Sequence, residues 1–181
     1  MTSFTDRIIG AARLDPQIYE EVEADQTAMG QAMAVVVLAG IAAGIGAARG
    51  GLGAGLVGGL AALVGWFIWA GLTYYIGAKV IPEPQTQADL GQLLRTIGFS
   101  AAPGFLKVLG ILPVLGGILV FLASVWQLVA MVVAVRHALD YTSIGRAVLV
   151  CLIGFIVYLV VTLAIMLAVG GVAVLGGAVA G

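Results

Sequence analysis

The chain has 181 residues, 62% of them hydrophobic and only 9% charged, and its formal net charge is −1. Soluble domains carry about 25% charged residues, so this composition excludes an ordinary soluble domain. The few, scattered basic residues exclude a nucleic-acid-binding surface. The single cysteine, Cys151, has no partner for an intramolecular disulfide, and we expect it to be a small buried hydrophobe.

Residues 1–28 are polar, and their pattern predicts two short helices ahead of the first apolar run. Apolar residues recur at helical spacing over Ser3–Arg13: Phe4, Ile8, Ile9 and Ala12. This spacing predicts an amphipathic helix on the membrane surface. Asp15 and Pro16 predict the start of a second helix, because Asp caps helix N-termini and Pro is favoured at the first helical position. We expect that helix to run into the first span with a bend at Gly30.

The second helix carries four acidic residues, Glu20, Glu21, Glu23 and Asp25, and Glu20 and Glu23 could share a face with Asp15. No histidine lies nearby in the sequence, and no loop has the spacing of a calcium site. We therefore expect a solvated acidic face and no metal ion. The first apolar run lacks the cleavage pattern of a signal peptide, so we expect the N-terminus to be retained.

Five apolar runs follow, and each reaches the length of about 20 residues that a helix needs to cross a bilayer. These runs are Met29–Ala48, Leu52–Gly77, Gln92–Leu112, Val114–Val135 and Ala147–Val169. The sequence predicts an all-α, polytopic transmembrane helix bundle with five spans. It divides into a cytoplasmic amphipathic segment, 1–28, and a membrane domain, 29–181. Trp66 and Trp69 of the second span are expected to pack against other helices.

Glycines spaced four residues apart occur in the first two spans: Gly40 and Gly44, then Gly51, Gly55 and Gly59. Such spacing lets helix backbones approach closely in lipid, where no hydrophobic effect drives helices together. These glycines therefore predict close helix packing, either within one chain or between copies in an oligomer.

The third span is the least apolar, and it holds Arg95, Pro103 and Lys107. Pro103 removes one i to i−4 hydrogen bond, which predicts a kink. Ionisable groups within spans are costly and often functional. Arg95 and Lys107 lie about one turn from opposite ends of the span, so we expect both side chains to snorkel to the interface. We further expect Arg95 to bond to Asp89 or Asp140.

The inner ends of the spans carry further polar residues. The segment Thr86–Asp89 resembles a capping box for the third span. The fourth span ends with Arg136 and His137, and a helix C-terminus favours cations, so we expect a solvated His137. Asp140 lies within reach of Arg136 and Arg146 across a short loop, which predicts an ion-pair network that orders these ends.

Basic residues are divided unevenly between the two sides of the predicted bundle. With the N-terminus in the cytoplasm, six lie inside: Arg7, Arg13, Lys79, Arg95, Arg136 and Arg146. Only Arg49 and Lys107 lie outside. Cytoplasmic loops of membrane proteins carry an excess of Lys and Arg, so this division predicts a cytoplasmic N-terminus and an outer C-terminus.

Three stretches carry a family resemblance: LDPQIYEEVEAD, TQADLGQLLRTIGFSAAPGFL and VWQLVAMVVAVRHALDYTSIGRA. They resemble the Yip1-domain family of multi-pass membrane proteins, specifically its short prokaryotic members. The resemblance implies five spans, with the N-terminus in the cytoplasm and the C-terminus outside, in the bacterial cytoplasmic membrane. Eukaryotic relatives are associated with Rab GTPases and vesicle traffic, and nothing in this sequence implies such a partner. The family has no catalytic residues to carry over.

No metal signature, phosphate loop, nucleophile elbow or dinucleotide fingerprint occurs in the sequence, so we expect neither an enzyme nor a cofactor. We predict a non-enzymatic membrane scaffold or accessory subunit whose cytoplasmic face binds a partner or lipid, as a homo-oligomer or within a larger membrane complex. The alternative is an oligomeric permease or channel for a small solute or ion, working around Arg95, Pro103 and Lys107. A hydrated path to the third span would favour the permease, and a dry, packed third span would favour the scaffold.

Overall fold

The computed structural model describes residues 2–48 and 51–179, and within these ranges the chain is 83% helical with no β-strand. The helices, in chain order, are α1 (Phe4–Ala12), α2 (Pro16–Ala24), the 3₁₀ turn η1 (Gln26–Ala28), α3 (Met29–Ala48), α4 (Gly51–Tyr74), the π-helical η2 (Tyr75–Val80), α5 (Leu90–Phe99), the 3₁₀ helix η3 (Ala102–Ile111), α6 (Gly116–Ala138) and α7 (Ile144–Val179). The prediction of an all-α fold is confirmed.

The two N-terminal helices begin where the sequence predicts them. Ser3 and Asp6 form a capping box at the start of α1, and the Asp15 side chain accepts a backbone hydrogen bond at the start of α2. The expected continuous helix through Gly30 is not formed. Asp25 is extended and ends α2, and the short turn η1 then leads into α3.

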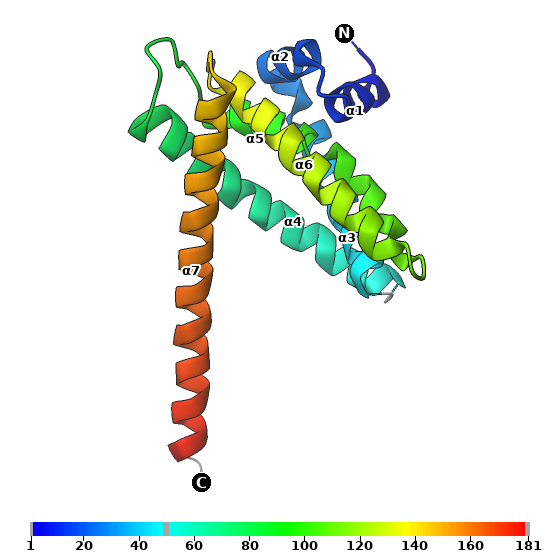
Figure 1. The fold of residues 1–181 in the computed structure, drawn as a ribbon, viewed down its shortest axis with the longest axis vertical. Helices are drawn as coiled ribbons and strands as arrows, with labels where there is room; N and C mark the ends of the chain where they lie inside the picture. Colours follow the sequence, from blue (N-terminus) through cyan, green and yellow to red (C-terminus); the bar gives the residue numbers. More distant parts are fainter. Residues whose placement is uncertain (1, 49–50, 180–181) are drawn as a thin grey trace.

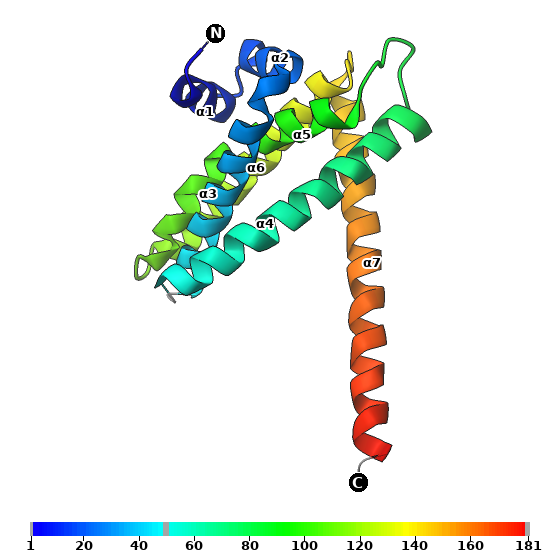
Figure 2. The same ribbon diagram turned by 180° about the vertical axis from the view of Figure 1, so that it is seen from behind.

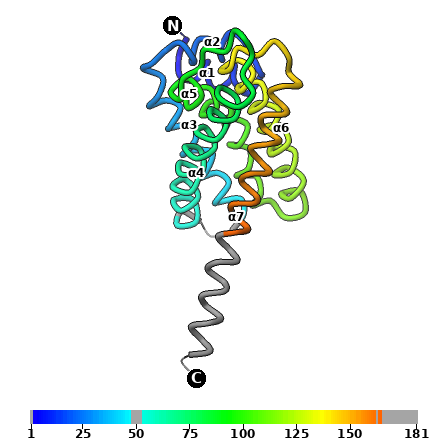
Figure 3. The backbone as a smooth tube through the Cα atoms, turned by 90° about the vertical axis from the view of Figure 1, so that its left-hand side faces the viewer, coloured from blue at the N-terminus to red at the C-terminus, as the bar shows by residue number. Residues whose placement is uncertain are grey.

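The chain runs back and forth between two ends of the molecule (Figure 1). We call one of them the polar end: it contains α1, α2 and the loops 81–89 and 139–143 (Figures 1 and 3). The end of α3 and the start of α4 lie at the opposite end, and α7 leaves the polar end and diverges from the other helices (Figure 2). Which end faces the cytoplasm stays a prediction. Gly50 and Gly181, which are predicted to face outward, lie outside the described residues.

Four helices in the described ranges are long and apolar enough to cross a membrane: Gln26–Ala47, Gly53–Val80, Gly116–Ala138 and Ile144–Val161. The predicted count of five spans is not confirmed. The residues of the third predicted span form two shorter pieces, α5 and η3, of ten residues each. Ten residues rise about 15 Å in an α-helix and about 20 Å in a 3₁₀ helix, so neither piece alone spans the roughly 30 Å hydrocarbon thickness.

Pro103 lies at the start of η3 and not inside a continuous α-helix. The helix α5 ends at Phe99, and Pro103 takes one of the first two positions of η3. Proline is favoured at such a position because its missing N–H would have no partner there in any case. The predicted kink at Pro103 is therefore not confirmed, since an α-helix stops here and a 3₁₀ helix begins.

Glycines bring α3 and α4 into close contact. A methyl group added at Gly40 would lie 2.6 Å from a carbonyl oxygen of α4, and one added at Gly44 would lie 3.1 Å from the Cα of Gly55. Methyl groups added at Gly55 and Gly59 would each lie 3.1 Å from an isoleucine side chain of α3. The predicted close approach therefore occurs between two helices of one chain. The surroundings of Gly51 lie outside the described side chains.

Candidate functional site

Arg7 is the centre of an ion-pair network at the polar end. It is only 2% exposed, although it belongs to a surface helix. Its Nη2 lies 2.8 Å from Glu21 Oε1 and 2.7 Å from Asp25 Oδ2. Its Nη1 donates a hydrogen bond of 3.0 Å to Gln31 Oε1. One side chain therefore joins α1, α2 and α3.

Both carboxylates of this network are held in their charged form. Hydrogen bonds from Arg7 and then Thr2 lower the pKa of Glu21. Hydrogen bonds from Thr27 and then Arg7 lower the pKa of Asp25 to about 2. Glu21 and Asp25 therefore do not belong to the expected solvated acidic face, whereas Glu20 of the same helix is 68% exposed. Arg7 is absent from the sequence-predicted site residues, although two acids four residues apart share one side of a helix and indicate a basic partner.

Arg95 holds α2 against α5. It is 6% exposed, and its Nε donates to the carbonyl oxygens of Val22 at 3.0 Å and Glu23 at 3.1 Å. The last carbonyl groups of a helix lack intrahelical partners and carry partial negative charge, so the guanidinium satisfies the end of α2. The prediction that Arg95 bonds to Asp89 or Asp140 is wrong, because α2 folds over α5 and supplies these carbonyl groups instead.

Asp89 marks the first turn of α5 and has a capping role. Its side chain accepts the N–H of Gln92 at 2.9 Å, and Gln92 Oε1 accepts the N–H of Asp89 at 2.6 Å. These two bonds form a reciprocal capping box. The capping box predicted over Thr86–Asp89 is therefore wrong. The Thr86 hydroxyl instead donates to the Leu139 carbonyl oxygen at 2.9 Å and ties the two loops of the polar end together.

The helix α2 also covers the end of α6 at His137. The imidazole stacks on Tyr19 with ring centroids 6.1 Å apart, its Nδ1 lies 3.6 Å from Glu20 Oε1, and the side chain is 13% exposed. The expectation of a solvated His137 is wrong because α2 packs over it. On the same helix α2, burial and then the charge of Asp140 raise the pKa of Glu23 to about 7. This carboxyl group therefore changes charge near neutral pH.

A second cluster joins the loops 81–89 and 139–143 around Glu83, which is buried. Glu83 Oε2 accepts the N–H of Thr142 at 3.0 Å and its hydroxyl at 2.9 Å. Glu83 Oε1 lies 3.2 Å from Arg146 Nε. The hydrogen bonds from Thr142 lower the pKa of Glu83 and keep it charged. The cluster fixes the second half of the polar end.

The predicted network of Arg136, Asp140 and Arg146 forms with different partners. Arg146 pairs with Glu83, and Arg136 Nε donates to the Tyr141 carbonyl oxygen at 3.2 Å. The expected pairing of Asp140 with either arginine is therefore wrong, because Glu83 and a loop carbonyl are closer. Within residues 2–48 and 51–179, no three His, Cys, Asp or Glu side chains come close enough to hold a metal ion.

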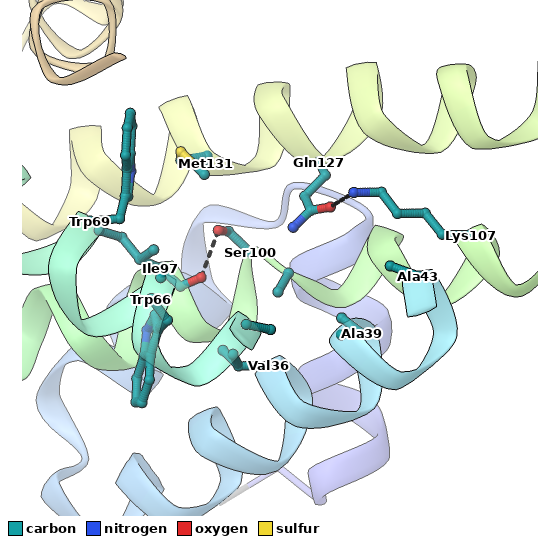
Figure 4. Close-up of a pocket in the computed structure, with 14 residues that line it drawn as sticks. Val36, Ala39, Ala43, Trp66, Trp69, Ile97, Ser100, Lys107, Gln127 and Met131 are labelled. Carbon is teal, nitrogen blue, oxygen red and sulfur yellow. Dashed lines mark hydrogen bonds between the residues drawn. The ribbon is translucent and has the colours of Figure 1, made fainter. Parts of the chain in front are cut away.

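An apolar cavity of about 260 Å³ lies between α3, α4, α5 and α6 (Figure 4). Its apolar lining includes Val36, Ala39, Trp66, Trp69, Ile97 and Met131, and its polar lining comes from Ser100, Lys107 and Gln127. Trp66 is buried, and its Nε1 donates to the Leu94 carbonyl oxygen at 3.0 Å. The prediction that Trp66 packs against other helices is therefore confirmed.

Lys107 turns toward this cavity and does not snorkel to an interface. Its Nζ donates a hydrogen bond of 2.7 Å to Gln127 Oε1 (Figure 4). The cavity lining includes Lys107 but neither Arg95 nor Pro103. The three residues predicted to work together in a permease are therefore not brought into one site.

A sequence model of the Yip1 domain matches residues 15–166. The chain belongs to the Yip1 domain family. Membership in the Yip1 family, together with four helices long and apolar enough to span a membrane, makes it a multi-pass membrane protein in contact with the lipid bilayer. The match to the Yip1 domain begins at Asp15, so it includes α2 and leaves out α1. No curated protein and no solved structure matches the chain.

Proposed function

We propose that this Yip1-domain protein is a non-enzymatic scaffold or accessory subunit of the bacterial cytoplasmic membrane. Its polar end faces the cytoplasm and binds a partner protein or lipid headgroups. The observation that supports this proposal is that side-chain contacts hold the helices and loops of the polar end together. Arg7 joins α1 to α2 and α3, Arg95 joins α2 to α5, and Glu83 joins two loops. A surface that is already ordered loses little conformational entropy on binding, which favours recognition.

The alternative of a permease or channel has less support. A pathway for a polar solute or ion needs polar groups along its length. Arg95 is covered by α2, and the cavity beside Lys107 is mostly apolar and does not extend to Arg95 or Pro103. The contact of Arg95 with α2 and the apolar lining of the cavity argue against a continuous polar path along α5 and η3, and such a path is what a permease needs and a scaffold does not.

The variant Arg95→Gln distinguishes the two functions. For a scaffold, we expect it to unfold at a lower temperature in detergent, because α2 loses its link to α5. Potassium and glycerol flux through reconstituted vesicles should equal that of protein-free vesicles for both wild type and variant. Arg13→Gln, which changes an exposed arginine at the end of α1, is the matched control and should leave stability unchanged. Wild-type flux that Arg95→Gln alters while the fold survives would establish the permease instead.

Photo-crosslinking in native membranes tests the binding role itself. A crosslinking residue at Glu20, whose side chain is 68% exposed at the polar end, should give discrete adducts with a protein or a lipid headgroup. The same residue at Leu60, which is exposed on α4, should give only acyl-chain adducts. Arg7→Gln should remove the Glu20 adducts by loosening α1 and α2. A lack of discrete adducts at Glu20 would contradict the proposal.

A further inference from the structure

Lys107 is an ammonium group without a carboxylate partner in the part of the chain that the structure describes. None of the helices from α3 to α7 contains an Asp or Glu. The one hydrogen bond that its Nζ makes goes to the neutral side chain of Gln127. An ammonium can donate three hydrogen bonds, so two donors remain for a ligand. A cation among apolar helices is costly in free energy, and such a residue indicates a functional site.

The place of this ammonium is also unusual. Gln127 is at the middle of α6, which runs from Gly116 to Ala138 and has no other charged or amide side chain before Arg136. Lys107 therefore reaches from η3 toward the middle of an apolar helix. A ligand that fills the space beside this helix and also neutralises the ammonium group would be mostly apolar with a small anionic group.

The cavity next to Lys107 has the matching shape and chemistry (Figure 4). Its walls come from α3, α4, α5, η3 and α6, and its volume is about 260 Å³. An apolar cavity of about 150 Å³ stays dry and takes up benzene, so this one has room for about ten carbon atoms on the same scale. The Nε1 of Trp69, which also lines the cavity, is buried and has no hydrogen-bond partner among the described residues.

We propose that this cavity binds a long-chain fatty acid, with the carboxylate held by Lys107 and the chain lying along the apolar walls toward Trp69. About ten carbon atoms of one chain fit the volume, and the rest of a longer chain leaves through the open side into lipid. A phospholipid also has an anionic head, but its phosphate group is bulkier than a carboxylate and its glycerol carries two chains. The site is separate from the polar end, so its test does not depend on the scaffold function.

Two pairs of variants test the site with matched controls. Lys107→Met removes the ammonium and keeps the apolar stem, and Lys79→Met changes the only other lysine in the chain, whose Nζ lies over the Tyr74 ring outside the cavity. Gly65→Leu places a side chain in the cavity wall, where an added methyl group meets nothing within 4 Å. Gly53→Leu is equally free of clashes on the same helix and does not line the cavity.

The measurement is saturable binding of tritiated palmitate to the purified chain in detergent, with the thermal unfolding midpoint of each variant recorded alongside. We expect Lys107→Met to weaken binding at least tenfold and Gly65→Leu to abolish it, while Lys79→Met and Gly53→Leu bind as the wild type does. Hexadecanol, which lacks the charge, should compete at least tenfold less well than palmitate.

Three results would overturn the proposal. The first is an absence of saturable palmitate binding to the wild type. The second is unchanged binding to a folded Gly65→Leu or Lys107→Met variant. The third is competition by phosphatidic acid as strong as that by palmitate, which would assign the anionic head to a phospholipid. If Lys107→Met does not fold, the Gly65→Leu and Gly53→Leu pair decides between the outcomes alone.

Discussion

Replacing Arg7 by Gln should loosen the contacts that join α1 and α2 to α3, while Arg95 still holds α2 against α5. Removal of one partner from a buried ion pair costs about 3–5 kcal/mol, because the other partner is left uncompensated. Here the side chains of Glu21 and Asp25 are 28% and 12% exposed and regain part of their hydration when Arg7 is lost. Allowing for this screening, we expect a loss of about 2–3 kcal/mol in the free energy of unfolding.

Equilibrium unfolding in mixed detergent micelles measures that free energy, and amide hydrogen exchange over α1 and α2 locates the loss. A double-mutant cycle with Glu21→Gln isolates the coupling between the two side chains. Arg13→Gln is the control, because this exposed arginine should cost no more than about 0.5 kcal/mol. A loss for Arg7→Gln as small as that of the control would refute the assignment of Arg7 as the link between these helices.

Three further predictions concern packing, pH and topology. Gly44→Leu forces α3 away from α4 and should lower the free energy of unfolding by about 3 kcal/mol or more. Gly53→Leu is the control and should change it by no more than about 0.5 kcal/mol. Thermal unfolding measures both, and equal stability of the two variants would contradict the predicted helix contact. The pKa of Glu23 is raised from 4.5 to about 7 in the folded protein, so the free energy of unfolding should fall by about 1–3 kcal/mol as pH rises through that range. Glu23→Gln should flatten this dependence on pH. A pH dependence that is unchanged in Glu23→Gln would show that another group is responsible. In a cysteine-free background, a cysteine at Ser143 should be labelled from the cytoplasm and one at Gly50 only from outside, and the reverse pattern would invert the orientation.

The local features of the fold are predictable from the sequence because they depend on neighbouring residues. Asp15 followed by Pro16 predicts where α2 begins, and the structure has that start. The glycines at 40 and 44 predict a close helix contact, and α4 lies against them. The long apolar runs predict membrane helices, and four of them form as long helices.

The partners of the charged residues are not predictable in the same way, because they depend on how distant segments meet. Arg95 bonds to the carbonyl groups of Val22 and Glu23, which are more than seventy residues earlier in the chain. Backbone carbonyl groups occur at every position, so no sequence pattern marks the two that end α2 beside α5. The break at Pro103 is similar: proline marks an interruption, and tertiary packing decides whether a kink or a new 3₁₀ helix follows.

The charged side chains of this protein differ in how many of their hydrogen-bond donors have a partner in the fold. That difference distinguishes residues that stabilise the fold from a residue that binds a ligand. The arginines Arg7, Arg95, Arg136 and Arg146 each contact a group on another helix or loop. Loss of such a side chain leaves a buried carboxylate or carbonyl group without a partner, which costs stability. Loss of Lys107 leaves one amide oxygen without its partner but also removes an ammonium group from among apolar helices, so it should cost less stability than loss of Arg7 or Arg95. A screen that measures unfolding and palmitate binding on the same variants should therefore place Arg7 and Arg95 with stability and Lys107 with binding.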